Sequence, residues 1–139
     1  MDINRPDLWA IRADGAGDVT ATRVAWRASR QVPLKPSPLL VADKLYMVSD
    51  GGIATCLDAR TGAEFWQERI GGEHSASPVF VAGRIYFFSQ EGKTIVLQPG
   101  ENFKILATNQ LDDGFMASPA IAGKALLLRT KTHLYRVEQ

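Results

Sequence analysis

Residues 56–66 decide the fold of this chain, and they read Cys56-Leu57-Asp58-Ala59-Arg60-Thr61-Gly62-Ala63-Glu64-Phe65-Trp66. An apolar segment leads into a polar turn, and the turn leads into a second segment that carries a large aromatic side chain. Gly62 can take a positive φ in a tight hairpin at no steric cost, and the side chains of Asp58 and Thr61 can hydrogen-bond turn amides. Trp66 offers a broad flat surface and an indole N–H that needs an acceptor. The stretch therefore predicts a β-hairpin whose tryptophan holds a neighbouring unit in place.

The surrounding sequence repeats with a period of about forty residues. Ser-Pro pairs stand at residues 37–38, 77–78 and 118–119, and each opens the same pattern of a short apolar segment, a tight turn and a stronger strand. A polar loop and a third strand follow in all three units, and a fourth strand follows in two. The expected first strands are residues 39–41, 79–81 and 120–122, the second 44–48, 84–88 and 124–128, the third 53–57, 93–97 and 133–137, and the fourth 64–70 and 103–108.

The second strands are apolar at consecutive positions, which predicts that both of their faces are buried. Four-stranded antiparallel sheets that neighbours cover on both sides are the blades of a β-propeller. A two-sheet sandwich does not predict a regular forty-residue period, and no stretch has the pattern of an amphipathic helix. The sequence thus predicts an all-β chain that forms about three blade equivalents of an incomplete propeller.

We predict one continuous propeller segment over residues 1–139. Residues 37–76 and 77–117 form complete blades, residues 118–139 supply the first three strands of another, and residues 1–36 supply the last two strands of the preceding one. Residues 8–11 and 23–27 are the strands expected in that N-terminal unit. Strand edges left open at both ends favour pairing with another chain, so we expect a head-to-tail homo-oligomer.

Composition excludes several other classes of protein. The 139 residues include 16 basic and 15 acidic ones, so the chain has no electrostatic footprint for nucleic acid. No apolar run approaches the roughly 20 residues that span a bilayer, and the N-terminus lacks the pattern of a signal peptide. A single cysteine allows no internal disulfide.

The repeat resembles the PQQ-type β-propeller repeat, the blade of quinoprotein dehydrogenases and of many non-enzymatic relatives. Residues 57–66 match the tryptophan-docking motif of that family. The first unit retains the tryptophan of the motif as Trp26. In the third unit residues 98–102 are a decayed copy of the motif, with Leu106 near the tryptophan position. The sequence from residues 17–20 through residues 131–135 is similar to the C-terminal part of secreted bacterial PQQ-like proteins of unknown function. This resemblance implies a larger parent protein, a periplasmic or secreted location, and a last blade completed by a strand from the N-terminus of the protein.

Residues capable of chemistry are scattered along the chain. Cys56 lies on an apolar strand with no evident cationic neighbour, which favours a buried structural thiol. His74 and His133 have no Cys or His at ligand spacing. The pairs Asp112-Asp113 and Asp14 with Asp18 do not match the alternation of a calcium loop. We therefore assign no catalytic, cofactor-binding or metal-binding residue.

One face of the predicted propeller collects the loops that enter the first strands and the turns between second and third strands, and propellers commonly bind partners there. The residues we assign to this possible partner face are Lys35, His74, Asp112, Asp113, Met116 and Arg129. The sequence favours a non-catalytic scaffold or binding module over an enzyme. The alternative is a fragment of a quinoprotein oxidoreductase that binds PQQ and calcium.

Overall fold

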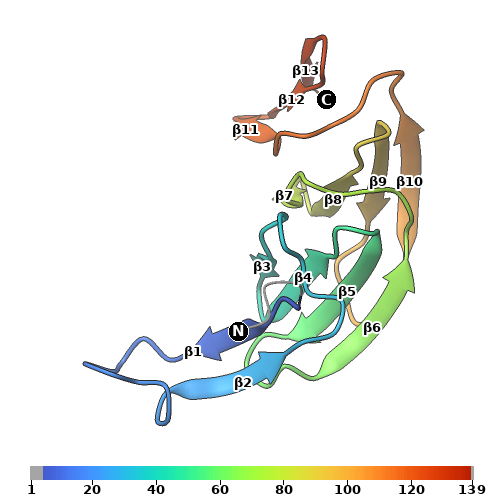
Figure 1. Cartoon of the computed structure of the whole chain (residues 1–139). Helices are drawn as coiled ribbons and strands as arrows, with labels where there is room; N and C mark the ends of the chain where they lie inside the picture. The colour runs from blue at the N-terminus through green and yellow to red at the C-terminus, as the bar shows by residue number, and fades with distance from the viewer. Residues whose placement is uncertain (1–4, 139) are drawn as a thin grey trace.

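The computed structural model describes residues 5–138, and all regular secondary structure in this range is antiparallel β-sheet (Figure 1). The strands form four sheets, called blades 1 to 4 in chain order. Blade 1 contains β1 (Leu8–Ile11) and β2 (Val24–Ala28); blade 2 contains β3 (Leu39–Val41), β4 (Lys44–Val48), β5 (Ile53–Asp58) and β6 (Glu64–Arg69); blade 3 contains β7 (Val79–Val81), β8 (Arg84–Phe88), β9 (Lys93–Leu97) and β10 (Ile105–Gln110); blade 4 contains β11 (Ala120–Ala122), β12 (Ala125–Arg129) and β13 (Leu134–Glu138).

Each strand pairs with its neighbour in sequence, and successive blades follow one another along an arc (Figure 1). Two complete four-stranded blades lie between a two-stranded and a three-stranded one. The predicted all-β class and the incomplete propeller are therefore confirmed. Residues 1–4 and 139, which the sequence assigned to the two terminal units, lie outside the described residues.

Most strands fall within a residue or so of their predicted positions, but the outer strand of blade 3 does not. β10 begins at Ile105 rather than Phe103 and continues to Gln110. The loop before it closes with a hydrogen bond from the Gln98 amide to the Lys104 carbonyl (3.0 Å), so the strand ladder resumes only afterwards. Phe103 instead packs edge-on against Trp66 of blade 2, with ring centroids 5.1 Å apart.

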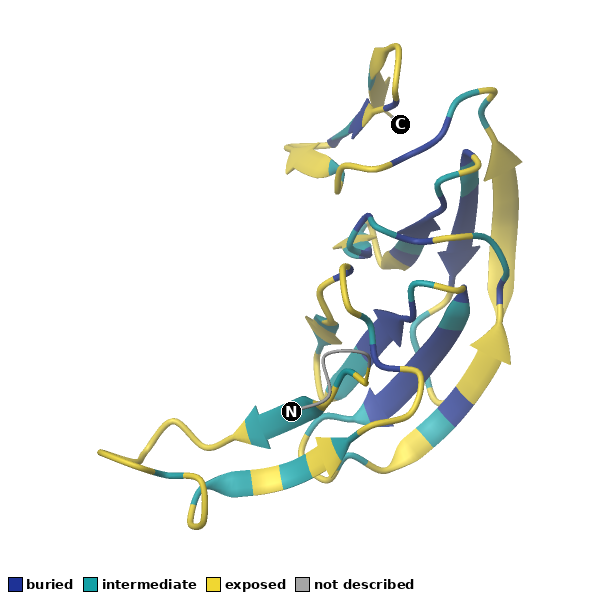
Figure 2. Cartoon of the chain, viewed as in Figure 1, coloured by how far each residue is buried: buried dark blue, intermediate teal, exposed yellow. Residues whose placement is uncertain are grey.

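The core lies between blades, because buried residues of blades 2 and 3 form one cluster. Figure 2 shows the buried residues concentrated on the central strands β4, β5, β8 and β9. Cross-strand pairing puts Tyr46, Cys56 and Trp66 on the face of blade 2 that meets blade 3. Ile85 and Phe87 are among the residues that blade 3 contributes from the opposite side. Most of β4 and most of β8 are buried because each has a neighbouring blade on both faces. The outer strands β6 and β10 are mostly exposed.

Candidate partner-binding face

The turn between β5 and β6 is held by its own side chains. Asp58 Oδ1 accepts hydrogen bonds from the amides of Arg60 (2.9 Å) and Thr61 (2.8 Å). Thr61 Oγ1 accepts one from the Ala63 amide (3.2 Å), and Gly62 takes a φ of 74°. These bonds give partners to amides that the strand ladder cannot reach, so the turn is rigid enough to receive a neighbouring side chain.

Indole rings connect blade 1 to blade 2 and blade 2 to blade 3. The indole N–H of Trp26 donates to the Ala59 carbonyl (3.0 Å), which belongs to the β5–β6 turn of the next blade. Trp66 repeats this contact one blade further on by donating to the Gly100 carbonyl (3.2 Å). A Cβ atom added to Gly62 would lie only 2.7 Å from Cδ2 of Trp26, so the ring rests directly on the glycine backbone.

A second contact recurs on the face where the loops enter each blade. The Asp50 carboxylate, on the β4–β5 turn, accepts a hydrogen bond from the Leu34 amide of the incoming loop (2.8 Å). Glu91 on the β8–β9 turn accepts the Glu73 amide in the same way (3.1 Å). In blade 4 the carboxylate belongs to the loop instead of the turn. Asp113 of the loop accepts a hydrogen bond from the amide of Thr132 on the turn (2.7 Å).

Of the residues that the sequence assigned to a partner face, some contact other parts of the fold and others remain exposed. Lys35 forms an ion pair with Asp50 (3.2 Å). The Asp113 carboxylate accepts hydrogen bonds from both the amide and the hydroxyl of Thr132. His74 is only 1% exposed, so it cannot present its ring to a partner while the chain is folded. Lys35 stays exposed despite its ion pair, and Asp112, Met116 and Arg129 are exposed as well.

Burial and hydrogen bonding shift the acidity of the residues on this face. Hydrogen bonding, first of all from the Thr132 side chain, lowers the pKa of Asp113 from 3.8 to about 2. Burial lowers the pKa of His74, although the Gly71 carbonyl, which lies 3.0 Å from Nε2, works against that shift. Asp113 is therefore a charged structural contact and His74 a neutral buried one at pH 7.

The single thiol lies deep between blades 2 and 3. Cys56 is fully buried, and this burial raises its pKa to about 11. Lys44 on the adjacent strand favours the thiolate, so a cationic neighbour is present that the sequence did not reveal. The desolvation of the charged form outweighs this lysine, and the thiol stays protonated at neutral pH.

Paired carboxylates elsewhere are engaged in local contacts. Asp14 pairs with Arg23 at 3.5 Å, and Asp18 Oδ1 accepts the Thr20 amide at 3.0 Å. Within residues 5–138 no group of three or more Cys, His, Asp or Glu side chains is arranged to hold a metal ion.

The Ser-Pro pairs form a ladder from blade to blade, a role that the repeat did not predict. The Ser37 amide donates to Ser77 Oγ (2.9 Å), and the Ser77 amide donates to Ser118 Oγ (2.9 Å). Each serine begins a blade and bonds its counterpart forty or so residues along the chain, so the contact fixes the spacing of the inner strands.

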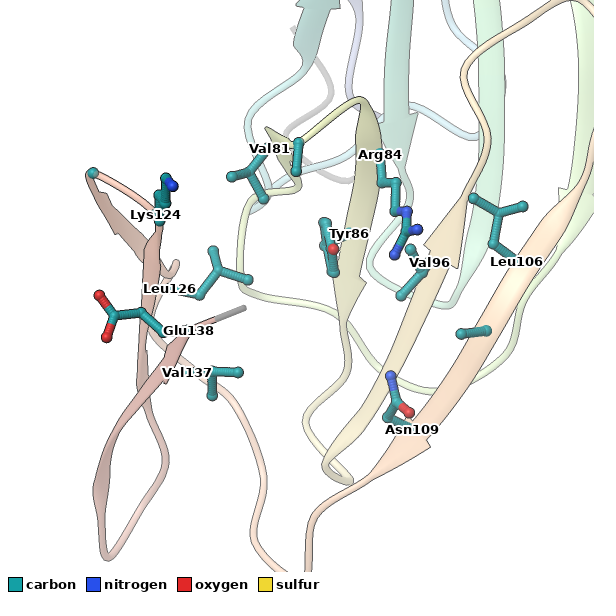
Figure 3. Close-up of a pocket in the computed structure, with 13 residues that line it drawn as sticks. Val81, Arg84, Tyr86, Val96, Leu106, Asn109, Lys124, Leu126, Val137 and Glu138 are labelled. Carbon is teal, nitrogen blue, oxygen red and sulfur yellow. The ribbon is translucent and has the colours of Figure 1, made fainter.

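A cleft of about 850 Å³ opens between blades 3 and 4 (Figure 3). Tyr86 and Val96 line it from blade 3, and Leu126 and Val137 line it from blade 4. Ala107 also lines it, from the outer strand β10. Sequence reasoning overlooked this cleft, because it depends on how far the two sheets stand apart.

The four-stranded sheets, the docked indoles and the blade-to-blade ladder define a β-propeller of the PQQ-repeat type. The sequence profile of the family described as outer membrane protein assembly factor BamB matches residues 14–139. The chain belongs to this family, which confirms the resemblance to PQQ-like repeats. Among curated proteins, sequence comparison finds no significant match.

Solved structures share the fold at low sequence identity. BamB from Moraxella catarrhalis is 16% identical with a TM-score of 0.66, and the match covers 81% of this chain and 33% of that one. A quinohemoprotein alcohol dehydrogenase from Comamonas testosteroni is 14% identical with a TM-score of 0.57 (70% and 17% covered). A europium-containing methanol dehydrogenase is 16% identical with a TM-score of 0.55 (68% and 19% covered). The chain thus spans about a third of the BamB structure and under a fifth of either dehydrogenase.

Proposed function

We propose that this chain is a segment of a non-catalytic propeller scaffold that binds another polypeptide through its loop face. The observation that carries the proposal is the exposure of Leu34 (62%) and Met116 (54%) on loops that enter blades 2 and 4. On the same face Lys35 pairs with Asp50 while staying exposed, and His74 and Asp113 are hydrogen-bonded within the fold. Apolar side chains that a partner can cover are expected at the centre of a protein-binding surface.

The family description supports a role in assembling outer membrane proteins, and we extend that role to this chain as part of the proposal. Such a role implies a location outside the cytoplasm, in keeping with the secreted relatives that the sequence resembles. No helix among residues 5–138 has the length and apolar character to cross a membrane.

Biolayer interferometry tests the proposal by measuring the affinity of the chain for an unfolded outer membrane barrel protein. The barrel protein is kept soluble in dilute urea. Replacing Leu34 and Met116 together by Asp should weaken binding at least tenfold. Ile11→Asp is the matched control, because Ile11 is equally exposed (55%) but lies on blade 1, away from the loops that carry Leu34 and Met116. Equal binding by all three proteins would contradict the proposed face.

A titration with PQQ and calcium separates this proposal from the quinoprotein alternative. We expect no change in PQQ absorbance and no calorimetric heat beyond dilution. Stoichiometric binding of PQQ would overturn the scaffold proposal in favour of a fragment of an oxidoreductase.

We also infer head-to-tail association of copies through the two outer faces. Blade 1 carries Trp9 stacked under the Arg27 guanidinium (3.7 Å), and blade 4 carries the exposed Leu134 opposite Arg129. Neither face has a covering blade among residues 5–138. Light scattering should show assemblies that grow with concentration, and a stable monomer at high concentration would rule this association out.

A further inference from the structure

The loop of residues 70–76, which leads from blade 2 into blade 3, joins two turns on the loop face. The His74 amide donates to the Asp50 carbonyl on the β4–β5 turn of blade 2 (2.8 Å). The Gln90 amide, on the β8–β9 turn of blade 3, donates to the Glu73 carbonyl (2.8 Å). Loop 70–76 therefore holds the turns of two successive blades in a fixed relation.

The same two turns hold the segments that carry the exposed apolar residues of the proposed partner face. The Asp50 carboxylate accepts a hydrogen bond from the Leu34 amide (2.8 Å). A carbonyl of the β8–β9 turn accepts one from the amide of Phe115, the residue before Met116 (3.2 Å). The placement of Leu34 relative to Met116 thus depends on the loop that joins the two turns.

The side chain of His74 closes loop 70–76 on itself. Its Nε2 lies 3.0 Å from the Gly71 carbonyl, and because a carbonyl only accepts, Nε2 carries the proton of the neutral ring. Gly71 and Gly72 both take a positive φ, 76° and 78°, and form the bend that this hydrogen bond closes. The side chain is only 1% exposed, so the folded chain encloses the ring.

The other ring nitrogen of His74 has no partner. Nδ1 is buried and makes no hydrogen bond with any residue that the structure describes. Protonation would add a charge to the ring and a second N–H at Nδ1, in a site closed to bulk water. A buried charge and an unmatched donor are both unfavourable, so the closed loop accepts the neutral ring and resists the charged one.

The charge of the ring is decided by burial against its polar surroundings. Burial is the stronger influence and lowers the pKa of His74 below the ordinary 6.5. The groups that favour the charged ring are the carbonyls of Gly71 and Phe88 and the carboxylates of Glu91 and Glu73. The other charged side chains on the surrounding elements are Arg69 at the end of β6, Lys93 on β9, Asp50 (paired with Lys35) on the β4–β5 turn, and Asp112 and Asp113 on the loop into blade 4.

We infer that His74 is a pH-sensitive latch on the loop face. In mild acid its ring leaves the buried site, loop 70–76 opens at its two glycines, and the frame that holds Leu34 and Met116 loosens. A polypeptide bound across that frame is then released. This inference rests on the proposed binding function and adds its regulation by pH.

The linkage between proton uptake and opening limits the size of the effect. The open loop binds a proton with an ordinary pKa of 6.5, more tightly than the closed loop does, so opening becomes more favourable as pH falls below 6.5. One such proton raises the open population by at most about tenfold between pH 7.5 and pH 5.5.

Amide hydrogen exchange of the whole chain tests the latch without any partner. Mass spectrometry follows peptides that cover loop 70–76 and β5, and an unstructured reference peptide corrects for the intrinsic effect of pH on exchange. The protection of loop 70–76 should fall roughly three- to tenfold from pH 7.5 to pH 5.5. Loop 70–76 should also be less protected than β5 at both pH values, because its opening is local. Equal protection of the two would overturn the latch, since the loop would then open only with the whole chain.

Two histidine variants assign the pH effect to one ring. His74→Gln keeps a side chain that can donate to the Gly71 carbonyl but does not titrate, so the pH effect on loop 70–76 should disappear. His133→Gln, which changes the exposed histidine, should retain it. If His74→Gln folds poorly, NMR titration of the wild-type ring decides: it should titrate below pH 6.5, over the range in which the loop loses protection. An effect that survives without His74, or a native ring that titrates at or above 6.5, would overturn the inference.

Dissociation of the unfolded barrel protein tests the link to the partner. Biolayer interferometry should show a dissociation rate that rises roughly three- to tenfold from pH 7.5 to pH 5.5 for the wild type. The rise should be smaller for His74→Gln, which has the same partner at the same pH values. An equal rise in both proteins, or none in the wild type, would overturn the inference.

The two proposals fail in different ways. If the Leu34 and Met116 variant binds the barrel protein as well as the wild type does, while loop 70–76 responds to pH through His74, the proposed partner face is wrong and the local opening stands. If that variant loses binding as proposed but the protection of loop 70–76 does not depend on pH, only the latch is wrong.

Discussion

The interface between blades 2 and 3 and the interface between blades 3 and 4 are made by the same repeat, yet they are not equally closed. The first buries a cluster of ten residues that includes Trp66, whereas the second buries a cluster of four. The Gly100 turn is held from both sides at the first interface, because its carbonyl accepts from Trp66 and its amide donates to the Tyr46 hydroxyl (2.9 Å). At the first interface the indole of Trp66 and the turn that receives it join the outer parts of the two blades.

What the two interfaces share is equally informative. Both have the serine ladder, and both have a carboxylate contact between the incoming loop and the turn of the next blade. These contacts lie at the inner strands and on the loop face, so they persist where the indole is lost. Among residues 5–138, blade 4 is therefore attached to blade 3 at the inner strands and on the loop face.

Trp66→Ala should give the largest effect, because it makes the second interface resemble the third. Loss of a buried tryptophan costs about 3–5 kcal/mol in the free energy of unfolding, and equilibrium unfolding in urea measures it. Trp9→Ala is the control, since Trp9 lies on the outer face of blade 1 against Arg27 and should cost about 1 kcal/mol. Similar losses of unfolding free energy for the two variants would show that the contact of Trp66 with the next blade does not contribute to stability.

A pair of glycine variants isolates the contact beneath the docked indole. Gly62 and Gly83 have nearly the same φ, 74° and 73°, but a Cβ at Gly62 would meet the Trp26 ring at 2.7 Å while one at Gly83 meets nothing within 4 Å. Alanine at either position bears the strain of a positive φ, about 1 kcal/mol. Gly62→Ala should lose roughly 1–2 kcal/mol more, as measured by thermal unfolding. Equal losses would mean that the ring moves aside freely.

His74 should make the junction of blades 2 and 3 sensitive to mild acid. Burial lowers its pKa below the ordinary 6.5, so the unfolded chain takes up a proton that the folded chain resists. Stability should therefore fall as pH drops below 6.5. His74→Gln should remove this part of the pH dependence, which urea unfolding at pH 7.5 and pH 5 would reveal. The exposed His133→Gln is the control and should leave it in place.

Asp113 should give the smallest effect, at the junction of blades 3 and 4 and at lower pH. The hydrogen bonds of Thr132 lower the pKa of this carboxyl from 3.8 to about 2, so its contribution is present above pH 3.8 and is lost as pH falls through about 2. Asp113→Asn should weaken that dependence, measured by circular dichroism between pH 5 and pH 2. Asp112→Asn changes the exposed neighbour, and an identical result for both variants would show that the Thr132 contact has no energetic role.

Local sequence features account for most of the fold. Ser-Pro spacing, consecutive apolar residues in the second strands and the polar turn before Trp66 predict the four-stranded units, because each depends on neighbours in the chain or on a period that can be counted. The geometry of the loops is harder to predict from sequence. β10 begins two residues later than expected, and Phe103 packs against Trp66 of the preceding blade.

The candidate sites were harder to predict, for a physical reason. Lys35, His74 and Asp113 look like free functional groups in the sequence, and only the packed loops reveal that Asp50, the Gly71 carbonyl and Thr132 occupy them. The cleft between blades 3 and 4 depends on the separation of two sheets and on the relative placement of their strands. Neither can be read from one strand.

The sequence by itself determined that this chain builds propeller blades, since strand pairing and the tryptophan turn are set by residues close together or one repeat apart. The tertiary structure alone decided which groups stay available to a partner. Each polar side chain is free or occupied according to what the adjacent blade presents to it, and that depends on three-dimensional contacts between blades.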